Sequence, residues 1–178
     1  MLQPEMELSG RKNTLLVKTT GLPPGAKGNL HTVKVMKRVA HQRAGHPLVR
    51  KLALNILNHY NVASHQFIDE AKAIGDYVKK KVRYVKDPTG IEQLHDPIML
   101  IDQIQRGIAR GDCDDMALLI AALLLSIGHK PKFRTVRYNH NSGAYNHIYV
   151  VDYAKNGPGK PKRVALDAIV KNKPIGFE

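Results

Sequence analysis

The sequence predicts an α+β fold with several N-terminal helices, one central apolar helix and a small C-terminal sheet. Between residues 29 and 82, apolar side chains recur at spacings of three and four, which is typical of amphipathic helices. Residues 116–127 are apolar with a single interruption, which favours a helix that other elements surround. Three short segments rich in β-branched and aromatic residues follow and predict the strands.

The 178 residues suit one domain with an extension. We expect residues 1–28 to form an extended N-terminal arm, because prolines and glycines interrupt residues 21–25, while residues 15–17 could form a short strand. The domain then spans residues 29–178, with a helical part at 29–63 and a core at 64–170. No apolar run reaches the roughly 20 residues of a membrane helix, and the N-terminus lacks a signal-peptide pattern.

The first helices have recognisable start signals. Pro47 occupies a favoured first-turn position for a second helix, which residues 45–46 separate from the first. A third helix is expected over residues 64–82, with its apolar side chains on one face. Asp96 and Pro97 are typical of the cap and first residue of a short fourth helix.

The strands of the sheet follow the central helix. Gly128 can end that helix, and Pro131 prevents its immediate return. The expected strands are residues 132–138, 147–153 and 163–167.

Cys113, the single cysteine, lies at the start of the apolar helix. In the first turn of a helix a thiol faces unpaired backbone N–H groups and the positive end of the helix dipole, and both favour the thiolate. We therefore expect a nucleophile whose pKa lies below the ordinary thiol value. The charges of Asp112, Asp114 and Asp115 oppose this effect, and Asp112 and Asp115 also have the spacing of a helix cap. The alternative for Cys113 is a small buried residue without chemistry.

His147 and Asp167 lie in two of the expected strands. Because side chains alternate between the faces of a strand, these two can meet if their strands are antiparallel neighbours. An imidazole between a thiol and a carboxylate can accept the thiol proton, return it to a leaving amine and be held in one tautomer. Asp152 also lies on a strand and competes with Asp167 for the orienting role.

These residues give the region from about residue 64 to residue 169 its resemblance to the transglutaminase-like superfamily, in the short stand-alone form of bacteria and bacteriophages. The similarity lies in residues 82–84, residues 111–115, the aromatic-flanked His147 and the pair Leu166 and Asp167. It implies a papain-type acyl-transfer triad of Cys113 as nucleophile, His147 as base and Asp167 as orienting acid. It also implies a helical layer, with the nucleophile-bearing helix at its centre, packed on a small antiparallel sheet.

The oxyanion of such a reaction needs at least two hydrogen-bond donors. The Cys113 backbone N–H is the expected first donor, and Tyr84 is the candidate for the second. A Tyr84 buried beneath the site is an equal alternative, and Gln103 and Gln105 are further candidates. Large tissue transglutaminases have a tryptophan near the oxyanion. This chain has none, so we expect hydrolysis rather than cross-linking.

No cofactor and no metal is expected. A metal site would have to use Cys113, His129, His140 and His147 as ligands. These residues lack the closely spaced pairs of ligands found in zinc sites. The formal net charge of +13, from 28 Lys and Arg against 15 Asp and Glu, favours contact with nucleic acid or an anionic cell-wall polymer. A solvated basic face is an equal alternative.

Two functions from different classes are therefore expected. The first is a thiol-dependent acyl-transfer enzyme that hydrolyses an amide bond in a peptide or protein substrate. The second is a structural or assembly protein that binds partners through its basic surface and residues 1–28. A free thiol suits a reducing compartment, and we expect a cytoplasmic or virion-associated protein that does not enter a membrane.

Overall fold

The structure, a computed structural model, describes residues 16–19, 26–87, 92–137, 147–170 and 172–177. Within these ranges the chain is a mixture of helices and small sheets, which confirms the α+β class. The helices are α1 (Ala26–Ala44), α2 (Pro47–His59), α3 (Phe67–Lys81), α4 (Pro97–Gln105) and α5 (Cys113–Ser126). The strands are β1 (Leu16–Thr19), β2 (Arg83–Tyr84), β3 (Glu92–His95), β4 (Arg110–Gly111), β5 (Lys132–Val136), β6 (His147–Ala154) and β7 (Lys162–Leu166).

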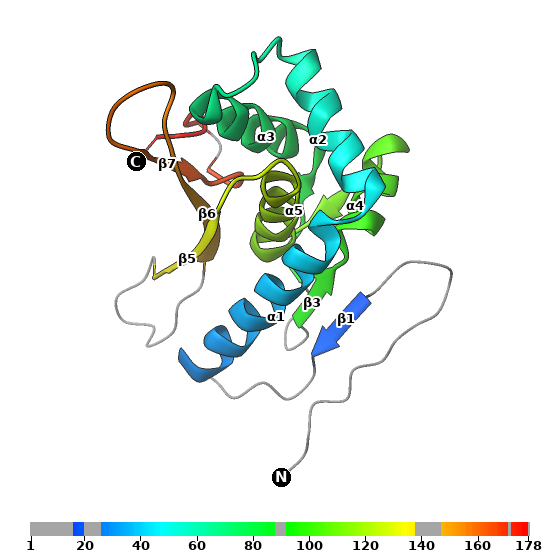
Figure 1. Ribbon diagram of the computed structural model, residues 1–178. Helices are drawn as coiled ribbons and strands as arrows, with labels where there is room; N and C mark the ends of the chain where they lie inside the picture. The colour runs from blue at the N-terminus through cyan, green and yellow to red at the C-terminus, as the bar shows by residue number, and fades with distance from the viewer. Residues whose placement is uncertain (1–15, 20–25, 88–91, 138–146, 171, 178) are drawn as a thin grey trace.

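Helix α5 lies at the centre of the molecule (Figure 1). Helices α1 to α4 pack around it, and the sheet that contains β6 covers another side. Residues 114–124 are all buried as a result. The expected central helix is confirmed, because a helix with apolar side chains around its whole circumference is stable only when neighbours cover every face.

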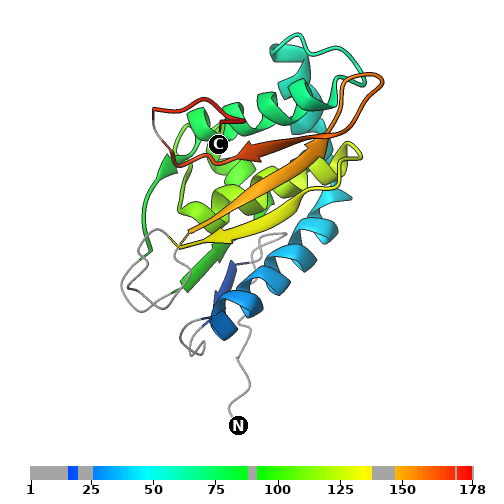
Figure 2. The same ribbon diagram turned by 90° about the vertical axis from the view of Figure 1, so that its left-hand side faces the viewer.

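Strands β5, β6 and β7 form an antiparallel sheet with β6 in the middle (Figure 2). Ile148, Val150 and Ala154 of β6 belong to the same buried core as α5. The three expected strands are therefore confirmed, with ends that shift by one or two residues. Tyr138, the expected end of the first strand, lies outside the described residues.

Two further strand pairings were not expected from the sequence, although a strand was expected at residues 15–17. β1 pairs with β3 in antiparallel fashion, and β2 pairs with β4 in parallel. Strands of two to four residues show no readable period of hydrophobicity, and their partners are far away in the sequence. Both pairs lie near the N-terminal end of α5 and so help to position the residues around Cys113.

The N-terminal boundary differs from the expected one. Helix α1 begins at Ala26, within the expected arm, and β1 of that arm pairs with β3 of the domain. A strand was expected at residues 15–17, and β1 overlaps it. Residues 1–15 and 20–25 lie outside the described part of the chain, so the independence of the arm stays a prediction.

Asp96 links helices α1 and α4. Its side chain caps α4 by accepting the Ile98 N–H at 2.8 Å, and Pro97 occupies the first turn, as expected. The same carboxylate accepts Nε and Nη2 of Arg43, both at 2.7 Å, and is fully buried. Both guanidinium nitrogens reach the same oxygen, Oδ2, and the charge-assisted pair holds the end of α1 against α4.

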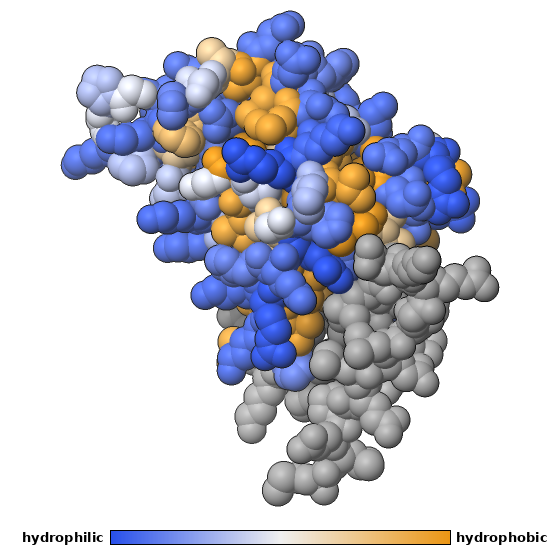
Figure 3. Space-filling view, turned by 45° about the vertical axis from the view of Figure 1, so that its right-hand side comes forward, coloured by the Kyte–Doolittle hydropathy of each residue, from blue (hydrophilic) through white to orange (hydrophobic). Residues whose placement is uncertain are grey.

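The helical side of the molecule is mostly polar on its surface (Figure 3). Apolar residues show between hydrophilic ones on this face, and Leu30, Leu48 and Leu54 of α1 and α2 are exposed. No helix in the described ranges is both long and apolar enough to cross a membrane.

Candidate functional site

Cys113 is the first residue of α5 and follows β4 after one residue. The parallel register of β2 and β4 places Tyr84 beside Gly111, two positions before the thiol. A Cβ on Gly111 would lie 2.8 Å from Cβ and Oδ2 of Asp115, so only glycine fits between the strand and the helix. The thiol side chain is half-buried at this junction.

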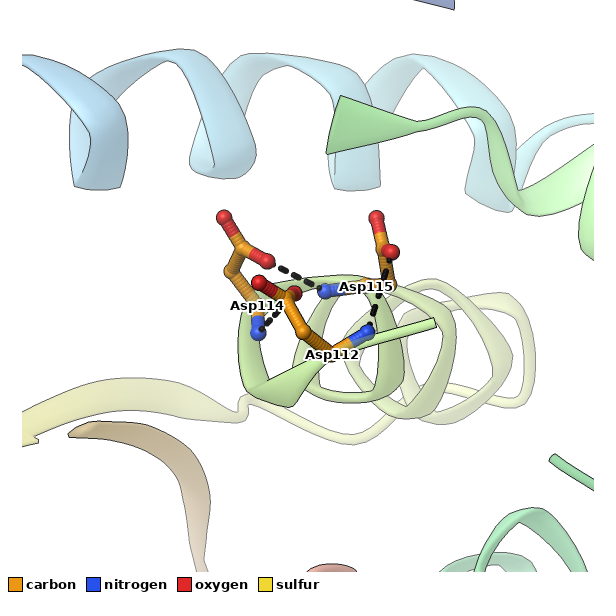
Figure 4. Close-up of side chains that lie close together, drawn as sticks. All are labelled: Asp112, Asp114 and Asp115. Carbon is orange, nitrogen blue, oxygen red and sulfur yellow. Dashed lines mark hydrogen bonds between the residues drawn. The ribbon is translucent and has the colours of Figure 1, made fainter. Parts of the chain in front are cut away.

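Three aspartates close the N-terminal end of α5 (Figure 4). Asp112 accepts the Asp114 N–H at 3.3 Å, Asp114 accepts the Asp115 N–H at 2.9 Å, and Asp115 accepts the Asp112 N–H at 3.2 Å. The expected capping pair of Asp112 and Asp115 is confirmed. One oxygen from each carboxylate lies within 4.8 Å of the others, which could suit a cation. Because all three carboxylates already accept backbone N–H groups, we assign the cluster to helix capping.

Asp115 also ties α5 to β3. Its Oδ1 accepts the His95 N–H at 2.6 Å, and its Oδ2 lies 2.6 Å from His95 Nδ1. Burial raises the pKa of Asp115, while the hydrogen bond to Asp115 raises the pKa of His95. A fully buried carboxylate with several donors fixes the helix end. No pattern in the sequence pointed to His95, because β3 is too short to predict.

The structure brings His147 and Asp167 together. His147 begins β6, Asp167 follows β7, and His147 Nε2 lies 2.7 Å from Asp167 Oδ2. The ring of His147 stacks on Tyr149, with centroids 5.7 Å apart, and Arg163 donates to the Tyr149 hydroxyl at 3.4 Å. A carboxylate on Nε2 fixes that nitrogen as the donor, so in the neutral ring Nδ1 is the proton acceptor.

The Cys113 sulfur lies against the first residues of β6. The Ile148 backbone N–H donates to it, and Ile148 directly follows His147. Burial raises the pKa of the Cys113 thiol to about 12, and the charges of Asp112 and Asp114 add to the rise, although the N–H groups of Ile148 and Cys113 oppose it. The expectation of a thiol pKa below its ordinary value is therefore wrong, because desolvation outweighs the helix terminus.

Tyr84 lies near the thiol but is not buried. Its side chain is 44% exposed, so the alternative of a tyrosine packed beneath the site is wrong. Burial of part of the ring, followed by the nearby charges of Cys113 and Asp112, raises the pKa of Tyr84 and keeps its hydroxyl protonated. Gln103 accepts the Arg110 N–H at 3.4 Å and so supports β4, and Gln105 is exposed at the end of α4.

Asp152, the competitor for the orienting role, belongs to a different cluster. Its Oδ2 lies 2.6 Å from Nδ1 of His129, whose Nε2 lies 2.9 Å from Glu70 Oε2. All three residues are buried, at the end of α5 opposite the thiol. Burial disfavours the charged ring, but the hydrogen bonds to Asp152 and Glu70 outweigh it and raise the pKa of His129. Sequence reasoning missed this cluster, although Glu70 lies three residues after Phe67 on the inward face of α3.

A pocket of about 600 Å³ also lies at this far end of α5. It is lined by Arg50, Leu54, Leu57, Asn58, Val62, Ser64, His65, Phe67, Glu70, Ile127 and Gly128. None of the expected catalytic residues lines it. His140, one of the candidate metal ligands, lies outside the described ranges. His129, another candidate, is bound by two carboxylates at the end of α5 opposite Cys113.

Comparisons with protein-family models, with curated proteins and with solved structures found no match to this chain.

Proposed function

We propose that the chain is a thiol-dependent acyl-transfer enzyme that hydrolyses a peptide or other amide bond through Cys113, His147 and Asp167. One observation carries the proposal. The imidazole of His147 is bound to a carboxylate through Nε2 at 2.7 Å, at the start of the strand whose next N–H group reaches the Cys113 sulfur. This is the order of nucleophile, base and orienting acid that acyl transfer needs.

The raised pKa of Cys113 favours attack by a thiol that loses its proton during the reaction. A thiol with a pKa of about 12 is protonated at neutral pH, so no thiolate is stored at rest. The sulfur attacks the carbonyl carbon while its proton moves to Nδ1 of His147. Asp167 stabilises the imidazolium that forms and keeps Nε2 protonated throughout.

The oxyanion would form at the N-terminal end of α5. The Cys113 N–H lies against its own sulfur, so it is placed to donate to an oxygen on the attacked carbon. The N–H groups of Asp114 and Asp115 already bind side chains of the cap. Tyr84, whose hydroxyl is protonated and close to the thiol, is the proposed second donor.

Hydrolysis then proceeds in two balanced steps. The tetrahedral intermediate collapses, the carbon–nitrogen bond breaks, and the departing amine takes the proton from His147. A water molecule attacks the thioester, gives its proton to His147 and releases the carboxylic acid, while the proton returns to the sulfur. We propose hydrolysis rather than cross-linking, and we propose that the helices and the β5–β6–β7 sheet form a transglutaminase-like core that holds this site.

The test is a screen of peptide and cell-wall peptide libraries with the wild type and Cys113→Ala side by side. We expect turnover by the wild type only. Asp167→Asn should leave a reduced remainder, because it disturbs the imidazole tautomer without removing nucleophile or base. Replacement of the exposed His41 by alanine is the matched control and should leave turnover intact. Turnover that survives Cys113→Ala would exclude the mechanism.

A second function is favoured by the same raised thiol pKa. A protein that keeps the fold for structure or assembly needs no reactive sulfur, and its basic surface and N-terminal arm would bind partners. This alternative predicts no turnover by the wild type and partner binding that survives Cys113→Ala. Under either proposal a free, unpaired thiol suits a cytoplasmic or virion-associated location.

A further inference from the structure

The two-stranded ribbon of β2 and β4 leads directly to the thiol, and the outer edge of β2 has no paired strand within the described ranges. The Arg83 N–H donates to Ala109 O, and the Val85 N–H donates to Gly111 O, both at 2.9 Å. Because neighbouring residues of a strand direct their backbone groups to opposite edges, the N–H and C=O of Tyr84 point away from β4. No other strand in the described ranges pairs with this edge of β2. An extended peptide could therefore add to it by backbone hydrogen bonds.

The two faces of the ribbon differ. Tyr84 and Gly111 are register partners on one face, and this face leads to Cys113 after one intervening residue. Arg83 and Arg110 are register partners on the other face, and both are exposed. A peptide on the β2 edge would also alternate between these faces. A peptide residue beside Tyr84 would then place one sequence neighbour beside Arg83 and the other beside Val85, on the face that carries both arginines.

The arginine pair is unfavourable without a partner. Like charges that lie directly opposite on paired strands destabilise the pairing. Neither Arg83 nor Arg110 forms a salt bridge with any residue for which the structure gives a position, and the exposed Lys81 and Lys86 add to the local charge. Asp87 accepts the Gln93 N–H. The three aspartates of the α5 cap, two of which also lie near Tyr84, accept backbone N–H groups of that cap.

Exposed apolar side chains lie on both sides of the ribbon. Tyr84, Val85 and Ile108 are 44%, 42% and 53% exposed, which is high for residues of this size next to a folded core. Tyr84 and Val85 could pack against a peptide that lies along the outer edge of β2, whereas Ile108 lies on the side of β4. The edge thus combines backbone groups, apolar contacts and a pair of cations.

We infer that the outer edge of β2 is the docking edge for an extended acidic peptide, which carries Asp or Glu next to the residue whose amide reaches Cys113. The inference rests on the proposed function, because it gives that site its substrate class. Charge complementarity selects the peptide, since a neighbour of the reacting residue lies beside Arg83, on the face that also carries Arg110.

The experiment measures binding without turnover. Full-length protein carrying Cys113→Ala is titrated into fluorescein-labelled peptides of about ten residues with a central Gln, flanked by Glu, by Gln or by Lys. By fluorescence anisotropy we expect the Glu peptide to bind at least about tenfold more tightly than the Gln peptide, and the Lys peptide to bind least. The advantage of the Glu peptide should fall as salt is raised.

Charge reversal supplies the decisive comparison. Arg83→Glu combined with Arg110→Glu should abolish the preference for the Glu peptide and favour the Lys peptide. Arg38→Glu, at an exposed position of α1, makes a matched change elsewhere and should leave the preference unchanged. Equal binding of the three peptides, or a preference that survives the reversal, overturns the inference.

Two further outcomes separate this inference from the proposed function. If the wild type hydrolyses Glu, Gln and Lys peptides equally well, the enzyme proposal stands and the acidic docking edge fails. If the Glu peptide binds as expected but no peptide is cleaved, the docking edge stands and the enzyme proposal fails. Binding of a single-stranded oligonucleotide that is lost on charge reversal, with no binding of peptides, would reassign the edge to nucleic acid and overturn the inference.

Discussion

The two ends of α5 each hold a buried histidine, but the partners of the two rings differ. At the C-terminal end His129 lies between two carboxylates, at 2.6 Å from Asp152 and 2.9 Å from Glu70. At the N-terminal end His147 has a carboxylate on Nε2 and lies next to the residue that contacts the Cys113 sulfur. A ring held by carboxylates on both nitrogens is stabilised as the imidazolium and has no acceptor to offer. A ring with one carboxylate can still take a proton.

The two groups of residues differ in how deeply their charged side chains are buried. The Glu70–His129–Asp152 cluster joins α3, the turn after α5 and β6, and all three residues are buried. The second group, the proposed catalytic residues Cys113, His147 and Asp167, includes a half-buried thiol and a partly exposed carboxylate. Burial of every charged group favours a structural role for the first cluster, while access to the sulfur favours a chemical role for the second.

The largest expected effect is the loss of turnover when His147 is replaced by alanine. Removal of the proposed base should lower the rate of the proposed amide hydrolysis by roughly 10²–10⁴-fold. The free energy of unfolding should change by about 0.5–3 kcal/mol, the ordinary range for one substitution. Steady-state kinetics and urea unfolding test the two parts separately, with His41→Ala as the control. If His129→Ala lowered the turnover of the folded protein as much as His147→Ala, the two histidines would not differ in role.

Replacement of His129 by alanine should show the opposite pattern. It leaves Glu70 and Asp152 as two uncompensated buried carboxylates, which typically costs about 3–5 kcal/mol. The midpoint of urea unfolding should fall accordingly, while the folded fraction keeps its turnover. If Glu70→Gln and Asp152→Asn are added to His129→Ala, part of the stability should return. If His129→Ala were as stable as the wild type, the cluster would contribute little to the stability of the fold.

The reactivity of Cys113 sharpens the comparison further. Because its pKa is raised to about 12, alkylation by iodoacetamide should be slow at neutral pH and should rise about tenfold per pH unit up to the highest pH the fold tolerates. The alkylation rate is measured by quenching the reaction at set times and determining the alkylated fraction by mass spectrometry. A plateau near pH 6 would instead reveal a thiolate paired with protonated His147, and the proposed proton transfer during attack would be wrong.

The smallest expected effect is a pH dependence of stability that originates at His129. Its pKa is raised in the folded state, so the stabilisation from its bonds to Glu70 and Asp152 is fully present below the unfolded value of about 6.5. It is lost as pH rises through the folded pKa. Urea midpoints between pH 6 and pH 9 should fall for the wild type and stay flatter for His129→Gln. If the urea midpoints of both proteins fell in parallel with pH, the pH dependence of stability would originate at another group.

The candidate site shows how far residue patterns reach. Cys113, His147 and Asp167 could be selected because a thiol at a helix start and polar residues in apolar strands are conspicuous in the sequence. The cap formed by Asp112 and Asp115 was predictable because capping depends on residues three apart. The buried Glu70–His129–Asp152 cluster was not, because its members are separated by 59 and 23 residues and each alone resembles an ordinary surface group.

The central helix, the three-stranded sheet and the order of the site residues could be predicted from residue patterns, because apolar periodicity and local caps act over a few residues. The parallel pairing of β2 with β4, the partners of the two buried histidines and the pKa of Cys113 could be known only once the chain was folded. These depend on which distant groups meet and on how much water remains between them. Desolvation of the thiol, a property of the packed molecule, thereby outweighed the local effect of the helix terminus that the sequence displays.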